Sequence, residues 1–422
     1  MNIKIHPFIL RFTRQGTFLE IANLVLNNFF IFHATRLYKA LYGRFLYGDS
    51  DTYYDYKKYL ESETEKYALV VFPRFPLYKQ NYIGPLRFYF STNGLLLSWV
   101  KVLNQLGYTV DVIDMDNTSF IPKRNYDLWI QHGTSNYRYL KTQLPKTQLI
   151  AYDTGVYWKV FNKKEIERFD AFEKRMGIRP KYDRLIMNGP EYELLYKSTA
   201  AIISLGEYYT YESFRETPYL HKLSTLPNAT YLDLKRNIIS QGRNIEETKR
   251  NFVYFAGGGT IHKGLDLLIE VFSKNQRYSL YIAGELEEPF LSLYKKHLSL
   301  PNIHQVGFLK QQTKDFYRVI SPCLFNITPS AGEGSPGGVI DMLQYGIIPI
   351  VSYESNIDVS GFGFTLKKVS AEDIKNMIEM VSNLPNETLM KYSKVATEKS
   401  ETTYSESRHQ SNLKEILNKI VR

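Results

Sequence analysis

The sequence predicts an α/β fold with two domains, each built on a parallel β-sheet that helices cover. Two observations lead to this prediction. From residue 67 onward, short apolar runs alternate with helical segments, which is the pattern of successive strand–helix units. A chain of 422 residues is also longer than one ordinary hydrophobic core supports, so typical domain sizes favour two domains.

The first domain is predicted to occupy residues 67–225. Its first strand is expected at 67–72. A helix is expected over 93–106, where five apolar residues share one face and Gly107 ends the pattern. Further strands are predicted at 109–113, 127–131, 148–152 and 200–205.

The second domain is predicted over 226–404, because a new series of strands begins after a turn at 226–228. The segment 405–422 has a helical pattern and is expected to fold back onto the first domain. Ligands of open parallel sheets bind beyond the carboxyl ends of the strands, so the site is expected in a cleft where the domains face each other. The strands expected in this half are 252–256, 279–283, 303–306, 324–328 and 347–352.

Residues 1–66 are predicted to form a helical extension rich in aromatic and basic residues. Its apolar stretch, 18–32, places Glu20, Asn23 and Asn27 on one helical face, which is the pattern of a helix lying in a membrane interface. Packing of this helix on the protein's own body explains the pattern equally well. The stretch is shorter than the roughly 20 residues that a helix needs to cross a bilayer.

The charge of the chain favours anionic partners. Lys and Arg number 53 against 43 Asp and Glu, a formal net charge of +10, which suits nucleotides, phospholipid surfaces or nucleic acids. No nucleic-acid-binding motif accompanies this charge. The single cysteine, Cys323, excludes an internal disulfide and a cysteine-based zinc cluster. With no secretory signal evident, a cytoplasmic location is expected, with or without contact to the inner face of the plasma membrane.

Residues 329–352 read PSAGEGSPGGVIDMLQYGIIPIVS and carry the most informative pattern. Small residues from Ser335 to Gly338 stand where a helix begins, so unpaired backbone N–H groups there can approach a sugar or a phosphate closely. Glu333 lies in the loop before this helix, and Asp341 lies inside the helix near its start. One ligand can therefore touch both acids.

Residues 255–268, FAGGGTIHKGLDLL, run from a strand through glycines to a Lys–Gly pair that opens an apolar helix. A dinucleotide fingerprint, GxGxxG, needs glycine at its sixth position. Counted from Gly257, that position is His262. A P-loop needs lysine after its second glycine, but Leu265 follows Gly264. Hydride-transfer enzymes and P-loop NTPases are therefore disfavoured.

Over roughly residues 226–352 the chain resembles glycosyltransferase family 4, the glycosyl transferases group 1. The resemblance implies the GT-B fold, in which two Rossmann-like domains face a central cleft, and a nucleotide sugar as donor. It implies that Lys263 contacts the donor's diphosphate, Glu333 the sugar hydroxyls and Asp341 the ribose hydroxyls. Lys263 and Glu333 are the implied catalytic residues. The implied donor-binding residues are Gly257, Gly258, Lys263, Glu333, Gly334, Ser335, Gly337, Gly338 and Asp341.

Two positions depart from the family pattern. Asp341 stands where a Glu is usual, so its ribose contact is one methylene shorter. Gly258 and Gly259 occupy the stretch where many relatives carry an Arg, so the charge that faces the diphosphate rests more heavily on Lys263. His262 either assists this lysine or is an ordinary core or surface residue.

The first domain matches the family only weakly and is expected to hold the acceptor. Strands ending in DLWIQHG and IAYDTG place His132 and Asp153 at loops that can face the cleft, although relatives often carry a histidine at the position of Asp153. Arg87 lies in an aromatic-rich loop over 81–93. These three residues are the acceptor-side candidates, and roles confined to loop structure are the alternative.

The resemblance implies a retaining glycosyltransferase in which the departing phosphate takes the proton of the acceptor, so that no protein base is needed. Asp114–Asp116 spell a DxD, the metal-binding pattern of another glycosyltransferase fold, but so short a pattern is common by chance, and neither a metal nor another cofactor is expected.

The implied partners are a nucleotide sugar and a glycan or lipid-linked acceptor in surface polysaccharide synthesis, with peripheral contact to an anionic membrane and no nucleic acid. Three rivals stay open. They are a GT-B epimerase, a GT-B phosphorylase and a nucleotide-sugar-binding protein without turnover.

Overall fold

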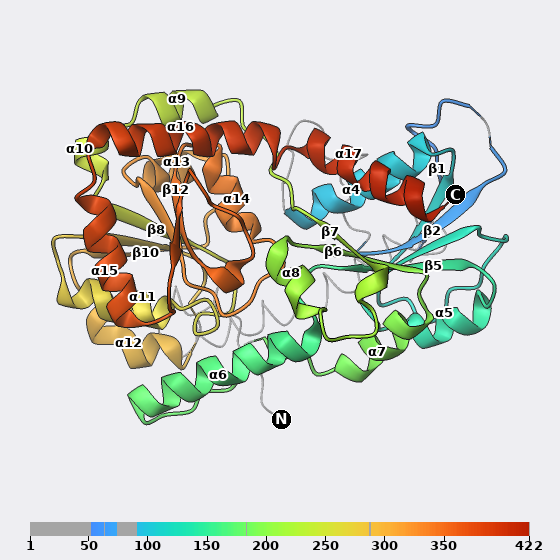
Figure 1. Ribbon diagram of the computed structural model, residues 1–422, viewed down its shortest axis with the longest axis horizontal. Helices are drawn as coiled ribbons and strands as arrows, with labels where there is room; N and C mark the ends of the chain where they lie inside the picture. Colours follow the sequence, from blue (N-terminus) through green and yellow to red (C-terminus); the bar gives the residue numbers. More distant parts are fainter. Residues whose placement is uncertain (1–51, 63, 74–90, 183, 287, 422) are drawn as a thin grey trace, which may run out of the picture. The chain divides into compact units, whose positions relative to one another are not determined.

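The computed structural model describes residues 52–62, 64–73, 91–182, 184–286 and 288–421. The predicted helix over 18–32 and the candidate Arg87 lie outside these residues. Within the described part, two parallel β-sheets are present, as predicted, with helices around them (Figure 1). None of the helices described is long and apolar enough to cross a bilayer.

The first sheet has seven strands in the order β1-β3-β2-β4-β5-β6-β7. The pairs from β3 through β7 are parallel. Strands β2 to β6 begin and end within about one residue of their predicted positions. The strands are β1 (Thr52–Tyr56), β2 (Tyr67–Val71), β3 (Thr109–Ile113), β4 (Leu128–His132), β5 (Gln148–Asp153), β6 (Ala201–Leu205) and β7 (Leu223–Leu226).

The two outer strands of this sheet are absent from the sequence prediction. β1 lies within residues 1–66, which the sequence assigns to an extension, so the sheet begins earlier than residue 67. β7 has only four residues, and the first three are partly exposed, so it shows no continuous apolar run. Short edge strands of this kind carry little hydrophobic pattern.

The helix predicted over 93–106 is α4. Gly107 follows it with φ +85°, a conformation that a residue with a Cβ resists. The predicted apolar face of α4 is buried, and it consists of Leu95, Leu96, Trp99, Val100 and Leu103. The helices of this half are α4 (Ser91–Gln105), α5 (Tyr137–Gln143), α6 (Trp158–Met176), α7 (Gly189–Ser198), α8 (Tyr208–Ser213) and the 3-10 turn η1 (Leu220–Lys222).

The second sheet has six parallel strands in the order β10-β9-β8-β11-β12-β13. The strands are β8 (Asn251–Phe255), β9 (Ser279–Ala283), β10 (Ile303–Gly307), β11 (Phe325–Thr328), β12 (Ile348–Ser352) and β13 (Phe364–Leu366). All except the three-residue β13 stand at predicted positions.

Helices surround the second sheet and close the chain. They are α9 (Arg236–Gln241), α10 (Ile245–Thr248), α11 (Leu265–Lys274), α12 (Phe290–Leu298), α13 (Lys314–Ile320), α14 (Gly337–Leu343), η2 (Tyr353–Ser355), α15 (Ala371–Ser382), α16 (Asn386–Thr402) and α17 (Glu406–Ile420).

The last helix returns to the first domain, as the sequence predicts. The Gln410 side-chain amide on α17 donates a hydrogen bond to the Ser98 hydroxyl on α4 at 3.3 Å. At the far end of α17, the Ile420 carbonyl accepts a hydrogen bond from the side chain of Gln148 on β5 at 3.1 Å. In Figure 1, α17 and α4 lie side by side.

A second connection is made by α6, which follows β5 of the first sheet but packs on the second domain. Phe169 and Phe172 of α6 lie in the same buried cluster as the core of the second sheet. The Arg168 guanidinium donates a hydrogen bond to Asp266 on α11 at 2.9 Å and another to the Ile261 carbonyl at 3.0 Å. Both charged side chains of this ion pair are almost fully buried, with exposed fractions of 7% and 1%.

Replacement of Arg168 by Met is predicted to destabilise the protein strongly. It leaves the buried Asp266 with Arg175 as its remaining arginine partner, so the expected loss is somewhat below the loss of about 3–5 kcal/mol for a buried charge left without any partner. The measurement is the free energy of unfolding in urea. The control is Lys163→Met on the same helix, whose ion pair with Glu167 is exposed and worth about 0–1 kcal/mol. Similar losses in the two variants would contradict the prediction.

Candidate functional site

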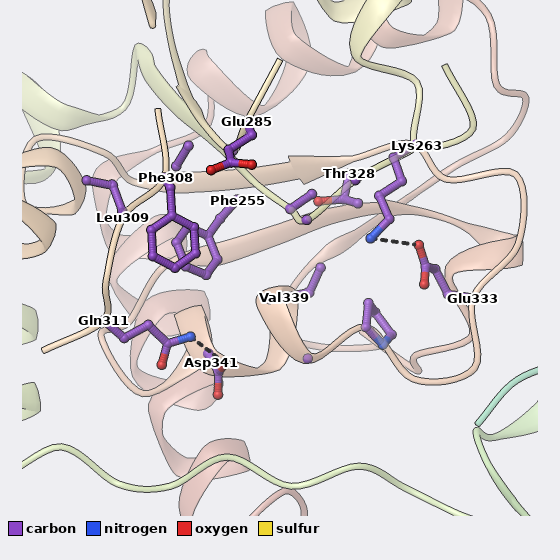
Figure 2. A pocket seen from close by; sticks show the side chains of 18 of the residues that line it. Phe255, Lys263, Glu285, Phe308, Leu309, Gln311, Thr328, Glu333, Val339 and Asp341 are labelled. Atoms are coloured by element: carbon purple, nitrogen blue, oxygen red, sulfur yellow. Dashed lines mark hydrogen bonds and ion pairs between the residues drawn. The ribbon is translucent and has the colours of Figure 1, made fainter. Parts of the chain in front are cut away.

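A cavity of about 580 Å³ opens at the carboxyl ends of β8, β9 and β11 in the second domain. The two segments singled out in the sequence meet here, because Lys263 comes from the loop after β8, and Glu333 and Asp341 come from the loop and helix after β11 (Figure 2). Of the residues predicted to bind the donor, Gly334 alone does not line the cavity. The predicted residues that do are Gly257, Gly258, Lys263, Glu333, Ser335, Gly337, Gly338 and Asp341.

Lys263 is held at the cavity by the turn that leads from β8 into α11. Its backbone N–H donates to the Gly259 carbonyl at 2.8 Å. The next residue, Gly264, has φ +75°, and a Cβ there would lie 2.6 Å from the Pro329 carbonyl oxygen. Only glycine therefore fits after the lysine. The Lys263 ammonium lies 3.3 Å from the Glu333 carboxylate, and Figure 2 shows this pair at the end of the cavity away from Asp341.

Glu333 remains negatively charged although it is almost enclosed. Burial opposes its ionisation, but the charges of Lys263, Arg184 and His262 outweigh burial and lower the pKa of Glu333 to about 2. The Ser330 hydroxyl also donates to the carboxylate at 3.0 Å. Glu333 can therefore accept hydrogen bonds at any physiological pH, but it holds no proton to donate.

Asp341 shows the opposite behaviour. Burial raises the pKa of Asp341 to about 6, although hydrogen bonds from Gln311 and Thr230 to its two oxygens, each 2.7 Å long, oppose the shift. Figure 2 shows Gln311 reaching Asp341 from the loop after β10. The side chain stands one turn into α14 at the end of the cavity away from Lys263.

Several of the small residues serve the packing of the chain itself. A Cβ at Gly338 would lie 2.5 Å from the Phe255 carbonyl oxygen, and one at Gly334 would lie 2.2 Å from that of Thr154. The Ser335 hydroxyl accepts the backbone N–H of Asn228 at 3.2 Å. Close approach of backbone to backbone, in addition to access for a ligand, therefore requires this sequence of small residues.

His262 lies inside the protein and does not line the cavity. Its Nδ1 faces the Glu165 carboxylate on α6, and its Nε2 lies 2.7 Å from the Gly332 carbonyl oxygen. Both ring nitrogens thus contact oxygen atoms of neighbouring residues. His262 therefore holds the two motif segments together, and the interpretation of it as a core residue is the one that fits.

The acceptor-side candidates are not brought to the cavity. His132 at the end of β4 donates from Nδ1 to the Tyr152 carbonyl at 3.2 Å, and burial lowers its pKa. The Asp153 carboxylate accepts the hydroxyl of Tyr196 and the backbone N–H of Thr154, and burial raises its pKa. Neither lines the cavity, and Arg87 lies outside the described residues.

No cluster of three potential metal ligands occurs among the residues that the structure describes. In the DxD segment, the Asp114 carboxylate accepts the backbone N–H of Asp116 at 3.1 Å, which is the contact of a local turn.

Sequence reasoning missed Phe308, Gln311 and Arg184. Phe308 lines the cavity with 60% of its surface exposed, and Figure 2 shows it among the lining side chains, next to Leu309 in the chain. An exposed aromatic residue in a loop after a strand is a signal that could have identified it. Arg184 lies 3.4 Å from Glu333, although it belongs to the first half of the chain. No local pattern in the sequence links these two residues.

A comparison with family models finds one match, and it lies within the second domain. Residues 237–399 match the model for glycosyl transferases group 1. This segment contains Lys263, Glu333 and Asp341. The sequence has no match among curated proteins.

Solved structures share the fold along most of the chain. Sucrose-phosphate synthase from Thermosynechococcus elongatus superposes with a TM-score of 0.59 and 11% identity, over 85% of this chain and 99% of the other. HepE from Anabaena, in complex with UDP and glucose, superposes with a TM-score of 0.53 and 11% identity, over 84% of this chain and 99% of HepE. WaaG, a glycosyltransferase involved in lipopolysaccharide biosynthesis, superposes with a TM-score of 0.52 and 13% identity, over 83% of this chain and 98% of WaaG. The fold is therefore GT-B, as the resemblance implies.

Asp341→Asn is predicted to change the pH dependence of stability in the ligand-free protein. Because the pKa of Asp341 is raised from 3.8 to about 6, the folded state keeps a proton that the unfolded state releases, and stability falls as the pH rises through this window. Asn carries no charge to bury. A difference of about two pKa units corresponds to about 3 kcal/mol, so D341N should gain about 1–3 kcal/mol over the wild type at neutral pH.

Urea unfolding at about pH 7.5 and about pH 4 measures this effect, since the gain should disappear at the lower value. Asp315→Asn on α13 is the control, because its side chain is 70% exposed. A gain of equal size at both pH values would show that the substitution acts through packing and not through the charge.

Proposed function

We propose that the protein is a retaining glycosyltransferase of family 4 that moves a sugar from a nucleoside diphosphate sugar to a hydroxyl of a glycan or lipid-linked acceptor. The observation that carries this proposal is the meeting of Lys263, Glu333 and Asp341 in one cavity of about 580 Å³. That volume lies within the range of small-molecule sites. The match to glycosyl transferases group 1 covers all three residues.

In the proposed complex the donor lies along the carboxyl ends of β8, β9 and β11. Lys263 contacts the diphosphate through a charged hydrogen bond, which is worth about 1.5–3 kcal/mol. Glu333 accepts hydrogen bonds from the sugar hydroxyls, a role that suits a carboxylate whose pKa is about 2. Asp341 receives the ribose hydroxyls, and the exposed ring of Phe308 offers a face for the base.

The proposed transfer retains the configuration of the anomeric carbon. The acceptor oxygen forms its bond to that carbon on the face that the diphosphate leaves, the bond from the carbon to the phosphate oxygen breaks, and the acceptor proton passes to the departing phosphate. Lys263 stabilises the negative charge that develops on the leaving group. Glu333 holds no proton to donate near neutral pH, and a carboxylate with a pKa of about 2 is a weak base, which together support a mechanism without a protein acid or base at this position.

The acceptor and its setting are proposed on charge and likeness. The net charge of +10 suits an anionic or membrane-linked acceptor at the cytoplasmic face of a membrane. WaaG is described as acting in lipopolysaccharide biosynthesis, and HepE is described in complex with UDP and glucose. We therefore propose a role in surface polysaccharide synthesis, with His132, Asp153 and Arg87 as acceptor-side residues and no metal.

A second candidate is a nucleotide-sugar-binding protein without turnover. Gly258, where many relatives have an Arg, favours this candidate, because a weaker positive charge supports binding more readily than departure of a diphosphate. A GT-B epimerase is a third. Product analysis separates the three, because only a transferase yields a glycosylated acceptor together with a free nucleoside diphosphate.

Lys263→Ala is predicted to weaken binding of the nucleoside diphosphate by about 10- to 100-fold, the equivalent of one lost charged hydrogen bond. Calorimetric titration with UDP, GDP and ADP, followed by product analysis with the matching nucleotide sugars, makes the measurement. Lys274→Ala is the control and should bind like the wild type, because Lys274 is exposed in the last turn of α11, the helix that follows Lys263. Equal affinities of K263A and the wild type would remove the diphosphate from this site.

A further inference from the structure

The charges that line the cavity do not by themselves favour an anionic ligand. Its lining contains the cations Lys263 and Lys310 and the acids Glu285, Glu333 and Asp341. The Glu333 carboxylate lies 3.3 Å from the Lys263 ammonium, so it offsets the one cation assigned to the diphosphate. A site for a diphosphate with this lining needs a further positive charge from a residue nearby.

Arg184 stands where such a charge is needed. Its guanidinium lies 3.4 Å from the Glu333 oxygen that Lys263 also approaches, so the two cations are within about 7 Å of each other. Arg184 does not line the cavity itself but stands beside its edge, with 34% of its side chain exposed. A guanidinium carries five N–H donors in a planar fork that matches phosphate oxygens.

The glycine loop after β8 makes room for this arginine. Gly259 has φ +96°, and a Cβ there would lie 2.7 Å from Cδ and 3.2 Å from Cγ of Arg184. The aliphatic part of Arg184 therefore packs directly on the loop. At Gly258, by contrast, a Cβ would meet nothing within 4 Å. Position 258 is thus open to a larger side chain, and Arg184 approaches the same loop from the first half of the chain.

Arg184 is also held in place from behind. Its backbone N–H donates to the buried Glu165 carboxylate at 2.9 Å, and the other oxygen of that carboxylate contacts His262, the neighbour of Lys263. Its guanidinium lies 5.7 Å from the ring centroid of Phe161, which stacks on His262. One buried pair therefore fixes both cations relative to each other before any ligand binds.

We propose that Arg184 is the second cation for the diphosphate of the donor, beside Lys263. This inference rests on the proposed function and deepens it. The leaving diphosphate is then gripped by a lysine of the second domain and an arginine of the segment between α6 and α7, so the site is complete only when both halves of the chain contribute. Departure of the diphosphate gains from the additional charge.

The test compares Arg184→Ala, Arg184→Gln and the double variant Arg184→Ala/Gly258→Arg in the full-length protein. The probes are inorganic pyrophosphate, whichever of UDP, GDP and ADP binds best, and the matching nucleoside. We expect each single variant to weaken diphosphate and pyrophosphate binding by about 10-fold or more while nucleoside affinity stays unchanged. In the double variant, the new arginine at the open position should restore most of the lost affinity.

Thermal unfolding of the ligand-free variants, with Gly258→Arg alone as reference, checks that all of them fold. Loss of diphosphate affinity without rescue by Gly258→Arg would overturn the proposal, because a purely structural Arg184 is not replaced by a charge from another position. Unchanged affinity in both single variants would overturn it as well. If K263A then still loses affinity, the proposed function stands without Arg184. If K263A is also unchanged, the site itself is wrong.

Discussion

A carboxylate that stays ionised while almost enclosed is the constraint on which the rest of the site depends. Glu333 keeps its charge because Lys263 and Arg184 both lie within 3.4 Å of one of its oxygens. Burial alone would make the neutral acid the stable form. Removing either cation therefore changes Glu333 as well as the cation's own contacts, and the three residues act as one electrostatic unit.

This unit is built from distant parts of the chain, and a second buried pair joins those parts. Glu165 on α6 contacts His262, and the His262 ring reaches the Gly332 carbonyl, one residue before Glu333. The same α6 helix is tied to α11 through Arg168 and Asp266. Charged groups buried in this way are weak evidence for added stability, but they fix one geometry, since each has few alternative partners inside a protein. The α6 helix, which follows a strand of the first sheet, thus helps to fix the positions of the residues around the cavity of the second domain.

Local patterns in the sequence were sufficient to predict the parts of the site that lie on short segments. The Lys–Gly pair and the acids at 333 and 341 were predictable because a strand, a glycine turn and a helix recur within about a dozen residues. Arg184 was not, because it meets Glu333 across a separation of 149 residues and no periodicity encodes that approach. Strands β7 and β13 escaped prediction because four and three residues are too few to show a pattern. Gly334 and Gly338 were predicted because a ligand needs access to the backbone there. The structure adds a second reason, since a Cβ at either position would clash with the backbone oxygen of Thr154 or Phe255.

The surroundings of Glu333 and Asp341 shift their pKa values in opposite directions, and this separates their roles. Glu333 lies among cations, so its pKa is about 2, and it can act only as an acceptor of hydrogen bonds. Asp341 is buried among neutral groups, so its pKa is about 6. Its two carboxylate oxygens accept hydrogen bonds from Gln311 and Thr230. Opposite shifts within one cavity generally mark groups with different tasks. Neither acid is suited to transfer a proton near neutral pH, because Glu333 holds none and is a weak base with a pKa of about 2, and Asp341 stands at the far end of the cavity from Lys263. This agrees with the proposed transfer, in which the departing phosphate takes the proton of the acceptor and fixed positive charge stabilises the leaving group.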